Sequence, residues 1–304
     1  MRKERLVRLA SPSRDAFVVW GYRFGSGRKR LAIIAGMRGH EIQQVAVASR
    51  LIRELVQREP RMIPGQEILV IPAANPFSLN VGRRFWSLDS TDINGMFPGY
   101  EAGETTQRIA KALLDSLSEF EYGINLTSTH EPGQYANHVR LHRTRSDNVN
   151  DALAFGLRYL HLREPDDQES GSLNYNWPIW NTQAFSLLGG EPFQVSHRQV
   201  GELVRAVLRF MTHIGLFPGD GTGGYRTEVL SDELMKPIWT ERAGLWRALR
   251  RVGDEISPGD LLGTVTDALS GKLLSTLRAQ EAGRVFYRVS APLVFQSMVS
   301  YVLC

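Results

Sequence analysis

The chain has 304 residues, with 36 basic and 32 acidic side chains and a formal net charge of +4. Hydrophobic residues make up 42% of the chain and charged residues 22%, which is typical of a folded globular protein and argues against intrinsic disorder. The length suggests about two domains. Only five of the basic residues are lysines. Arginine suits the recognition of carboxylates, although the base composition of the genome is the simpler explanation.

The sequence lacks the features of several protein classes. Cys304 is the only cysteine, so the chain forms no internal disulfide bond and no multi-cysteine zinc site. Residues 1–10 are charged and no apolar run follows them, so we expect no secretory signal. The sequence contains no apolar stretch of about 18 residues that predicts a membrane span, and no basic run with interleaved aromatics that predicts nucleic-acid binding. We therefore expect a cytoplasmic protein that binds neither membranes nor nucleic acids.

In the first two thirds of the chain, strand-like and helix-like patterns alternate. Short apolar runs are typical of buried strands, and apolar positions three or four apart are typical of helices. We predict strands over residues 17–24, 31–36, 67–72, 122–126 and 185–188, and helices over 41–57, 104–120 and 195–214. This alternation predicts an α/β fold with a largely parallel sheet flanked by helices. Functional side chains are expected in the loops that follow the strands.

The pattern changes near Phe217. Pro218 and the glycines that follow it up to Gly224 interrupt regular structure. Beyond Thr227 the segments are short and β-like, and turn signals separate them. We predict an α/β domain over 1–225 and a small β domain over 226–304 that forms a wall of the ligand pocket.

Three polar segments follow predicted strands. They are GMRGHE at 36–41, NPF at 75–77 with DINGMFPG at 92–99, and NLTSTH at 125–130. Their order and spacing resemble the succinylglutamate desuccinylase/aspartoacylase family of the zinc carboxypeptidase superfamily. That family has G-x-H-G-x-E after a strand, then N-P, an arginine, D-L-N-R-x-F-P-G and D-L-H. The resemblance covers nearly the whole chain, and the match over 92–99 is its most specific part.

The resemblance implies a zinc-carboxypeptidase-like α/β domain followed by a small, barrel-sandwich-like β domain. It also implies zinc-dependent hydrolysis of an amide or ester of a small carboxylated substrate. In the family, two histidines and a glutamate bind Zn²⁺, and a later glutamate acts as general base. At these four positions the sequence has Arg38, Glu41, Thr127 and Leu188.

These substitutions change the expected chemistry. A guanidinium has no lone pair to offer a metal and carries a positive charge, and a leucine cannot transfer a proton. We expect Arg38 to take the place of the cation and to pair with Glu41. The usual zinc and general-base residues are then lost, and the first hypothesis is a catalytically silent module that binds anions or regulates an active paralogue. Its ligand-binding residues would be Arg38, Arg84, Asn94 and Arg140.

The second hypothesis is an active hydrolase with a displaced metal site. His40, Glu41 and His130 lie in the right segments, and histidine with carboxylate suits zinc. On a helix, however, adjacent residues such as His40 and Glu41 diverge by about 100°. A homo-oligomer is a further possibility for either hypothesis.

Three other groups of residues invite an interpretation. His138, Arg140 and His142 alternate, so on a strand they share one face. That face either lines the pocket mouth or forms a solvated edge, and we favour the edge. We expect His161, His197 and His213 to be surface or partly buried helix residues. An aromatic loop contains Trp177 and Trp180, and we expect it to pack on the sheet.

Overall fold

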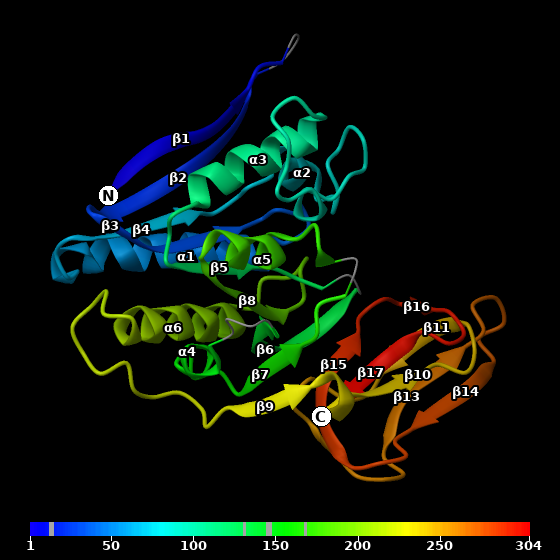
Figure 1. The fold of residues 1–304 in the computed structure, drawn as a ribbon. Coiled ribbons are helices and arrows are strands. Elements are labelled where there is room, and N and C mark those ends of the chain that lie inside the picture. Colours follow the sequence, from blue (N-terminus) through cyan, green and yellow to red (C-terminus); the bar gives the residue numbers. More distant parts are fainter. Residues whose placement is uncertain (12–14, 130–131, 144–147, 167–168) are drawn as a thin grey trace.

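A computed structural model describes residues 1–11, 15–129, 132–143, 148–166 and 169–304. Among these residues a 13-stranded mixed sheet forms the centre of the molecule (Figure 1). Its strands are β1 (Arg2–Leu9), β2 (Phe17–Gly25), β3 (Arg28–Ala35), β4 (Gln66–Ile71), β5 (Tyr122–Leu126), β6 (Gly133–His142), β7 (Tyr159–Arg163), β8 (Gln183–Gly190), β9 (Glu228–Ser231), β10 (Lys236–Trp239), β12 (Glu255–Ile256), β15 (Gly283–Val289) and β17 (Val299–Leu303).

The middle of this sheet is parallel and its margins are mixed. Strand β3 lies between β4 and β5 and is parallel to both, and β5 is parallel to β8. Strand β6 is antiparallel to β8 but parallel to β7. The predicted α/β fold with a largely parallel sheet is confirmed. The carboxyl ends of β3 and β5 therefore reach the same edge of the sheet, where their loops meet.

Helices cover both faces of the sheet, as the sequence predicted. Apolar side chains of α1 (Ile42–Arg58), α4 (Val149–Leu153) and α6 (His197–His213) build one hydrophobic core. On the other face lie α2 (Pro76–Val81), α3 (Thr105–Leu117) and α5 (Leu173–Asn176), which belong to a second core. Short 3₁₀ helices, η1 (Glu59–Arg61), η2 (Ile93–Gly95), η4 (Trp177–Trp180) and η5 (Asp232–Leu234), connect these elements.

The carboxyl-terminal strands form a third core and extend the central sheet. Strand β9 pairs in parallel with β7, and β15 pairs with β6. A separate four-stranded sheet contains β11 (Gly244–Ala248), β13 (Leu261–Thr266), β14 (Leu273–Arg278) and β16 (Leu293–Val294). Its strands β13 and β14 are the orange arrows at the lower right of Figure 1. This arrangement confirms the predicted β structure after the α/β elements.

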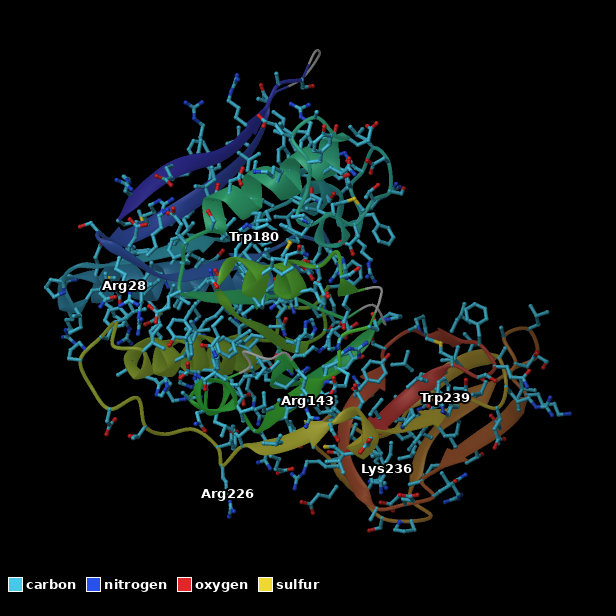
Figure 2. All side chains as sticks on the ribbon, in the orientation of Figure 1. Arg28, Arg143, Trp180, Arg226, Lys236 and Trp239 are labelled. Carbon is cyan, nitrogen blue, oxygen red and sulfur yellow. The ribbon has the colours of Figure 1, made fainter. Side chains whose placement is uncertain are left out.

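The elements agree with the predictions to within a few residues at their ends, and the aromatic loop packs as expected. Trp177 is fully buried, and its ring packs so closely on Gly123 that a Cβ at this position would lie 2.8 Å from the nearest ring atoms. Trp180 at the end of the loop remains 42% exposed (Figure 2). Among the described residues, no helix is both long and apolar enough to cross a membrane.

Candidate functional site

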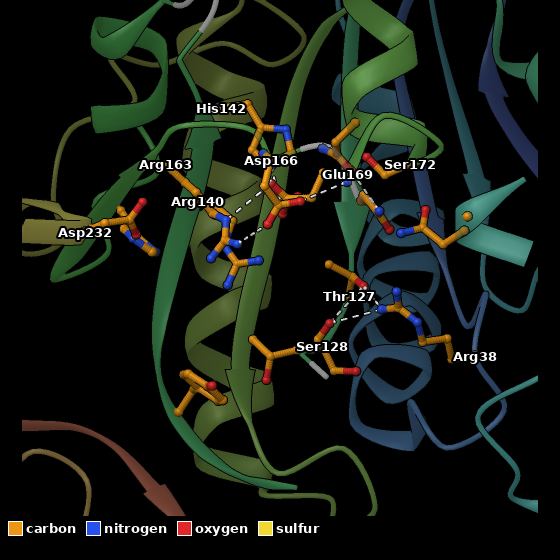
Figure 3. Close-up of a pocket in the computed structure, with 18 of the residues that line it drawn as sticks. Arg38, Thr127, Ser128, Arg140, His142, Arg163, Asp166, Glu169, Ser172 and Asp232 are labelled. Carbon is orange, nitrogen blue, oxygen red and sulfur yellow. Dashed lines mark hydrogen bonds and ion pairs between the residues drawn. The ribbon is translucent and has the colours of Figure 1, made fainter. Parts of the chain in front are cut away.

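A cavity of about 670 Å³ lies beside the carboxyl ends of β3, β5 and β7. Residues from the first and third polar segments line it, together with Asp92, Asn94 and Gly95 from the second. Phe286 of β15 and Val302 of β17 complete it, so the carboxyl-terminal strands supply part of the wall, as predicted. Figure 3 shows two polar groups facing each other across the cavity, one around Arg38 and one around Arg140.

Arg38 is at the centre of the first group. Its side chain is only 5% exposed. The Nε atom donates a hydrogen bond to Asp92 Oδ2 at 2.8 Å. The Nη1 atom donates to the Ser128 carbonyl at 3.1 Å and to Thr127 Oγ1 at 3.3 Å, and lies 3.5 Å from Glu41 Oε1. Burial lowers the pKa of Arg38, but the charges of Asp92 and Glu41 outweigh it and raise the pKa overall.

Glu41 is 1% exposed and fully engaged by the protein. Its Oε1 atom accepts hydrogen bonds from the Ser128 amide at 2.9 Å and from the hydroxyls of Thr127 and Ser128, each at 3.0 Å. Its Oε2 atom accepts from the Arg38 amide at 3.2 Å. Side chains at the first three positions that the resemblance singled out, Arg38, Glu41 and Thr127, thus meet at one point. The expected ion pair between Arg38 and Glu41 is present.

The remaining predicted residues are dispersed. Asn94 lines the cavity and accepts a hydrogen bond from the Leu173 amide at 3.3 Å. Arg84 is not among the described residues that line the cavity; its Nη2 atom lies 3.7 Å from Asp92 Oδ2. Leu188 is 1% exposed on β8, opposite His138 of β6.

The predicted displaced metal site is only partly described. The His40 ring is buried, and its centroid lies 5.3 Å from that of Phe193. Burial, together with the charges of Arg84 and Arg38, lowers the pKa of His40. The neighbouring Glu41 carboxylate already has the hydrogen bonds given above, and His130 lies outside the described residues. Within the described ranges, no group of three or more histidine, cysteine, aspartate or glutamate side chains is placed to hold a metal ion.

The second polar group lies on a row of side chains across four neighbouring strands. Asn125 of β5 is in register with Ser186 of β8, Ser186 with Arg140 of β6, and Arg140 with His161 of β7. All four line the cavity. The favoured solvated edge is therefore wrong: Arg140 and His142 line the pocket and His138 is completely buried. The prediction for His161 is also wrong, because this residue is a buried strand residue.

Each of the two histidines that line this wall, His142 and His161, lies next to a carboxylate. His161 Nε2 lies 2.8 Å from Asp232 Oδ1, and His142 Nε2 lies 3.6 Å from Glu169 Oε1. Glu169 also accepts a hydrogen bond from Arg163 Nε at 3.2 Å. Burial raises the pKa of Glu169, but His142, Arg163 and Arg140 together lower it to about 2. Arg163 further donates to Asp166 (Figure 3), whereas Arg140 has no comparable ion pair among the described residues.

Sequence reasoning missed His161, Glu169 and Asp232 as site residues. They come from three segments without a recognisable motif, and only the pairing of β6 with β7 and the position of η5 bring them to the cavity. The alternation of residues 138–142 was the one signal for this wall, and it did not distinguish a pocket face from a solvated face.

Comparison with known proteins adds a family and a fold. The family model described as "Succinylglutamate desuccinylase/Aspartoacylase catalytic domain" matches residues 27–214. No curated protein sequence matches the chain. A succinylglutamate desuccinylase from Silicibacter sp. superposes with a TM-score of 0.81 at 18% identity, over 99% of this chain and 94% of that one.

Two other solved structures are equally similar. An aspartoacylase family protein from Mesorhizobium loti has a TM-score of 0.80 at 21% identity, over 99% of this chain and 93% of the other. A product-bound structure of the ectoine utilization protein EutE (DoeB) from Ruegeria pomeroyi has a TM-score of 0.80 at 19% identity, over 99% and 94%. At these identities the likeness establishes the fold.

Proposed function

Because this chain belongs to the succinylglutamate desuccinylase/aspartoacylase family, we propose that it is a member in which a buried ion pair stands where the family holds zinc. Its pocket then binds a small carboxylated ligand without the family's metal-dependent hydrolysis. One observation carries the proposal. The Glu41 carboxylate, at the position of the family's zinc-binding glutamate, is paired with Arg38 and hydrogen-bonded by Thr127 and Ser128.

The donor set at this point does not fit a zinc ion. A guanidinium offers no lone pair, and Arg38 remains protonated because neighbouring carboxylates raise its pKa. A second cation beside this buried charge would be repelled at a distance of a few ångströms. Leu188, at the position of the general base, is apolar and buried. We derive no hydrolytic step through a metal in this member.

Binding is supported by the opposite wall of the pocket. Arg140 lines the cavity, whereas the guanidiniums of Arg38 and Arg163 are occupied by protein carboxylates. An arginine at a concave surface recognises carboxylates through two parallel hydrogen bonds. This favours a ligand-binding role for Arg140 over the other predicted arginines.

The first test measures metal content and ligand binding in the same preparation. We expect less than about 0.1 equivalent of zinc after purification in zinc-containing medium, and calorimetric binding of a small dicarboxylate that Arg140→Gln weakens at least about tenfold. One equivalent of tightly bound zinc, together with hydrolysis that a chelator abolishes, would support the displaced site with His40 and His130 and refute the proposal.

The second test restores the family's ligand set. Arg38, Glu41 and Thr127 already converge, with Thr127 Oγ1 lying 3.3 Å from Arg38 Nη1 and 3.0 Å from Glu41 Oε1. The double variant Arg38→His/Thr127→His should therefore acquire about one equivalent of zinc, because two imidazoles and a carboxylate form a common zinc site. The single variant Arg38→His is the control and should bind zinc much more weakly. A double variant that folds and stays zinc-free would show that these positions do not form a metal site.

A further inference from the structure

The four-stranded sheet near the carboxyl terminus carries a row of leucines across its strands. Leu293 of β16 is in register with Leu245 of β11, Leu245 with Thr266 of β13, and Thr266 with Leu273 of β14. The three leucines are 41–56% exposed. Figure 1 shows β13 and β14 away from the helices that cover the central sheet. The row is thus apolar, continuous from one edge of this sheet to the other, and open to solvent.

The burial of the neighbouring residues shows that the row belongs to one face. Trp246 and Val265, which are in register with each other, are buried in the third core. Side chains alternate between the two faces of a sheet, so the row beside this pair faces the solvent. Val294 of β16 is likewise buried, whereas Phe295 after it is 73% exposed. The turn between β13 and β14 adds Leu269 at the same end of the sheet, and Leu269 is 98% exposed.

These five residues, Leu245, Leu269, Leu273, Leu293 and Phe295, form an apolar patch that is large for a monomer. Together they expose the equivalent of about three whole residues, or about 600 Å² at about 200 Å² for each large apolar residue. The largest apolar patch on a typical monomer covers about 300–600 Å². Homodimer interfaces are about 65% apolar, so a face with this apolar content covers about 900 Å². A stable complex buries about 800 Å² on each partner.

The rim of the apolar patch carries charges of both signs. Arg247 lies on β11, Lys272 precedes β14, Glu241 and Arg242 lie in the turn that enters β11, and Asp267 follows β13. None of these five side chains has an ion-pair partner in the described parts of the chain, where the ion pairs of this unit join other residues. Unpaired charges of both signs favour a partner surface that also carries both, as a copy of the same face does.

We propose that this face binds the same face of a second copy of the chain, with the two four-stranded sheets stacked about a twofold axis parallel to the strands. Such a contact is closed, because each copy uses the same surface. The strand order is β14-β13-β11-β16, so this axis places β14 of one copy over β16 of the other. Leu273 then lies over Leu293 of the second copy, and Leu245 lies over Thr266. The apolar rows of the two copies cover each other along their full length.

The same axis brings opposite charges of the rim together. Thr240 Oγ1 donates a hydrogen bond to the Phe295 carbonyl, so the turn with Glu241 lies beside the β16 edge of the sheet. Lys272 lies at the β14 edge, at the same end. Stacking β14 over β16 therefore places Lys272 of each copy near Glu241 of the other. A twofold axis across the strands would instead stack β14 on β14 and separate these two charges.

Sedimentation equilibrium of the full chain tests the proposal. We expect twice the mass of the chain at protein concentrations of tens of micromolar. Leu293→Glu places a charge in the stacked row and should give the mass of the monomer; Leu293 is exposed, so the variant should keep the circular dichroism spectrum of the native chain. The matched control is Leu88→Glu, because Leu88 is a 70% exposed leucine outside the apolar patch. This control should remain a dimer.

A compensating variant tests the direction of the axis. In the proposed dimer, Leu273→Lys/Leu293→Glu on one chain places a lysine over a glutamate twice. It should therefore dimerise at least about tenfold more tightly than Leu293→Glu alone. The same affinity for both would overturn the axis parallel to the strands.

The other results that overturn the proposal are distinct. A chain that stays monomeric at these concentrations, or a dimer that Leu293→Glu leaves intact, would overturn binding of a second copy through this face. A monomer that sediments with phosphatidylcholine vesicles containing phosphatidylserine would overturn it in favour of a lipid surface. None of these results depends on the zinc content or the ligand binding of the pocket.

Discussion

Removing the Arg38 guanidinium tests whether it acts as the cation of the site. In Arg38→Met the buried carboxylate of Glu41 keeps its bonds from Thr127 and Ser128 but loses its neighbouring positive charge. Asp92 loses a 2.8 Å partner as well. Breaking a buried ion pair on one side costs about 3–5 kcal/mol, because the other charge remains buried without compensation. We expect the free energy of unfolding in urea to fall by that amount.

A double-mutant cycle isolates the pair. Arg38→Met/Glu41→Gln should be more stable than Arg38→Met alone, with a coupling energy of about 1–3 kcal/mol. The matched control is Arg58→Met, which breaks the exposed pair with Glu54 at 3.4 Å on α1 and should cost at most about 0.5 kcal/mol. A loss below about 1 kcal/mol in Arg38→Met, or strict additivity in the cycle, would refute the reasoning that Glu41 needs this cation.

Three further predictions concern the opposite wall of the pocket and its support. The pKa of Glu169 is lowered from 4.5 to about 2, so the ionised carboxylate stabilises the fold fully above about pH 4.5, and this stabilisation is lost as the pH falls toward about 2. Glu169→Gln should therefore lower the free energy of unfolding in urea at pH 7. The difference in this free energy between the variant and the native chain should vanish near pH 2. Burial lowers the pKa of His138 well below its usual value. The free energy of unfolding should therefore fall as the pH drops below about 6.5, by up to about 1.4 kcal/mol per pH unit. His138→Gln should flatten this pH dependence between pH 6.5 and 5, and an unchanged dependence would contradict a buried ring that is neutral in the folded state. Gly123→Ala would place a Cβ 2.8 Å from the Trp177 ring, and this overpacking of about 1–3 kcal/mol should lower the midpoint of thermal unfolding. Gly82→Ala is the control, because position 82 has open space around it but a φ of 61°. Its effect on the midpoint measures backbone strain alone.

The fold was predictable because its signals are local. Apolar runs such as residues 31–36 become β3, and the periodic segment 41–57 becomes α1 with both ends within one residue. Short apolar runs and helical periodicity arise from burial on one face, which the sequence records directly. The first strand, β1, has no such signal, because its residues are mostly charged and only Val7 is fully buried.

The site was predictable only where a motif carried it. The pairing of Arg38 with Glu41 was expected because the resemblance places both at the family's metal-binding positions and their charges are opposite. The Arg140 wall did not follow, because it depends on register between strands: a shift of one residue would point Arg140 and His161 to the other face of the sheet. Asp232 was harder still, since it reaches His161 across 71 residues of sequence from a 3₁₀ helix after β9.

On the proposed function, Arg38 supplies the positive charge that the zinc ion supplies in the family. A buried carboxylate such as Glu41 is stable only with a positive neighbour or enough hydrogen bonds, and in this chain both are supplied by the protein itself. On the proposed function, replacing only Arg38 with histidine would remove the cation before a second histidine is present at position 127 and would leave Glu41 without a positive neighbour. The other polar groups of the pocket lie on the opposite wall, around Arg140 and His161.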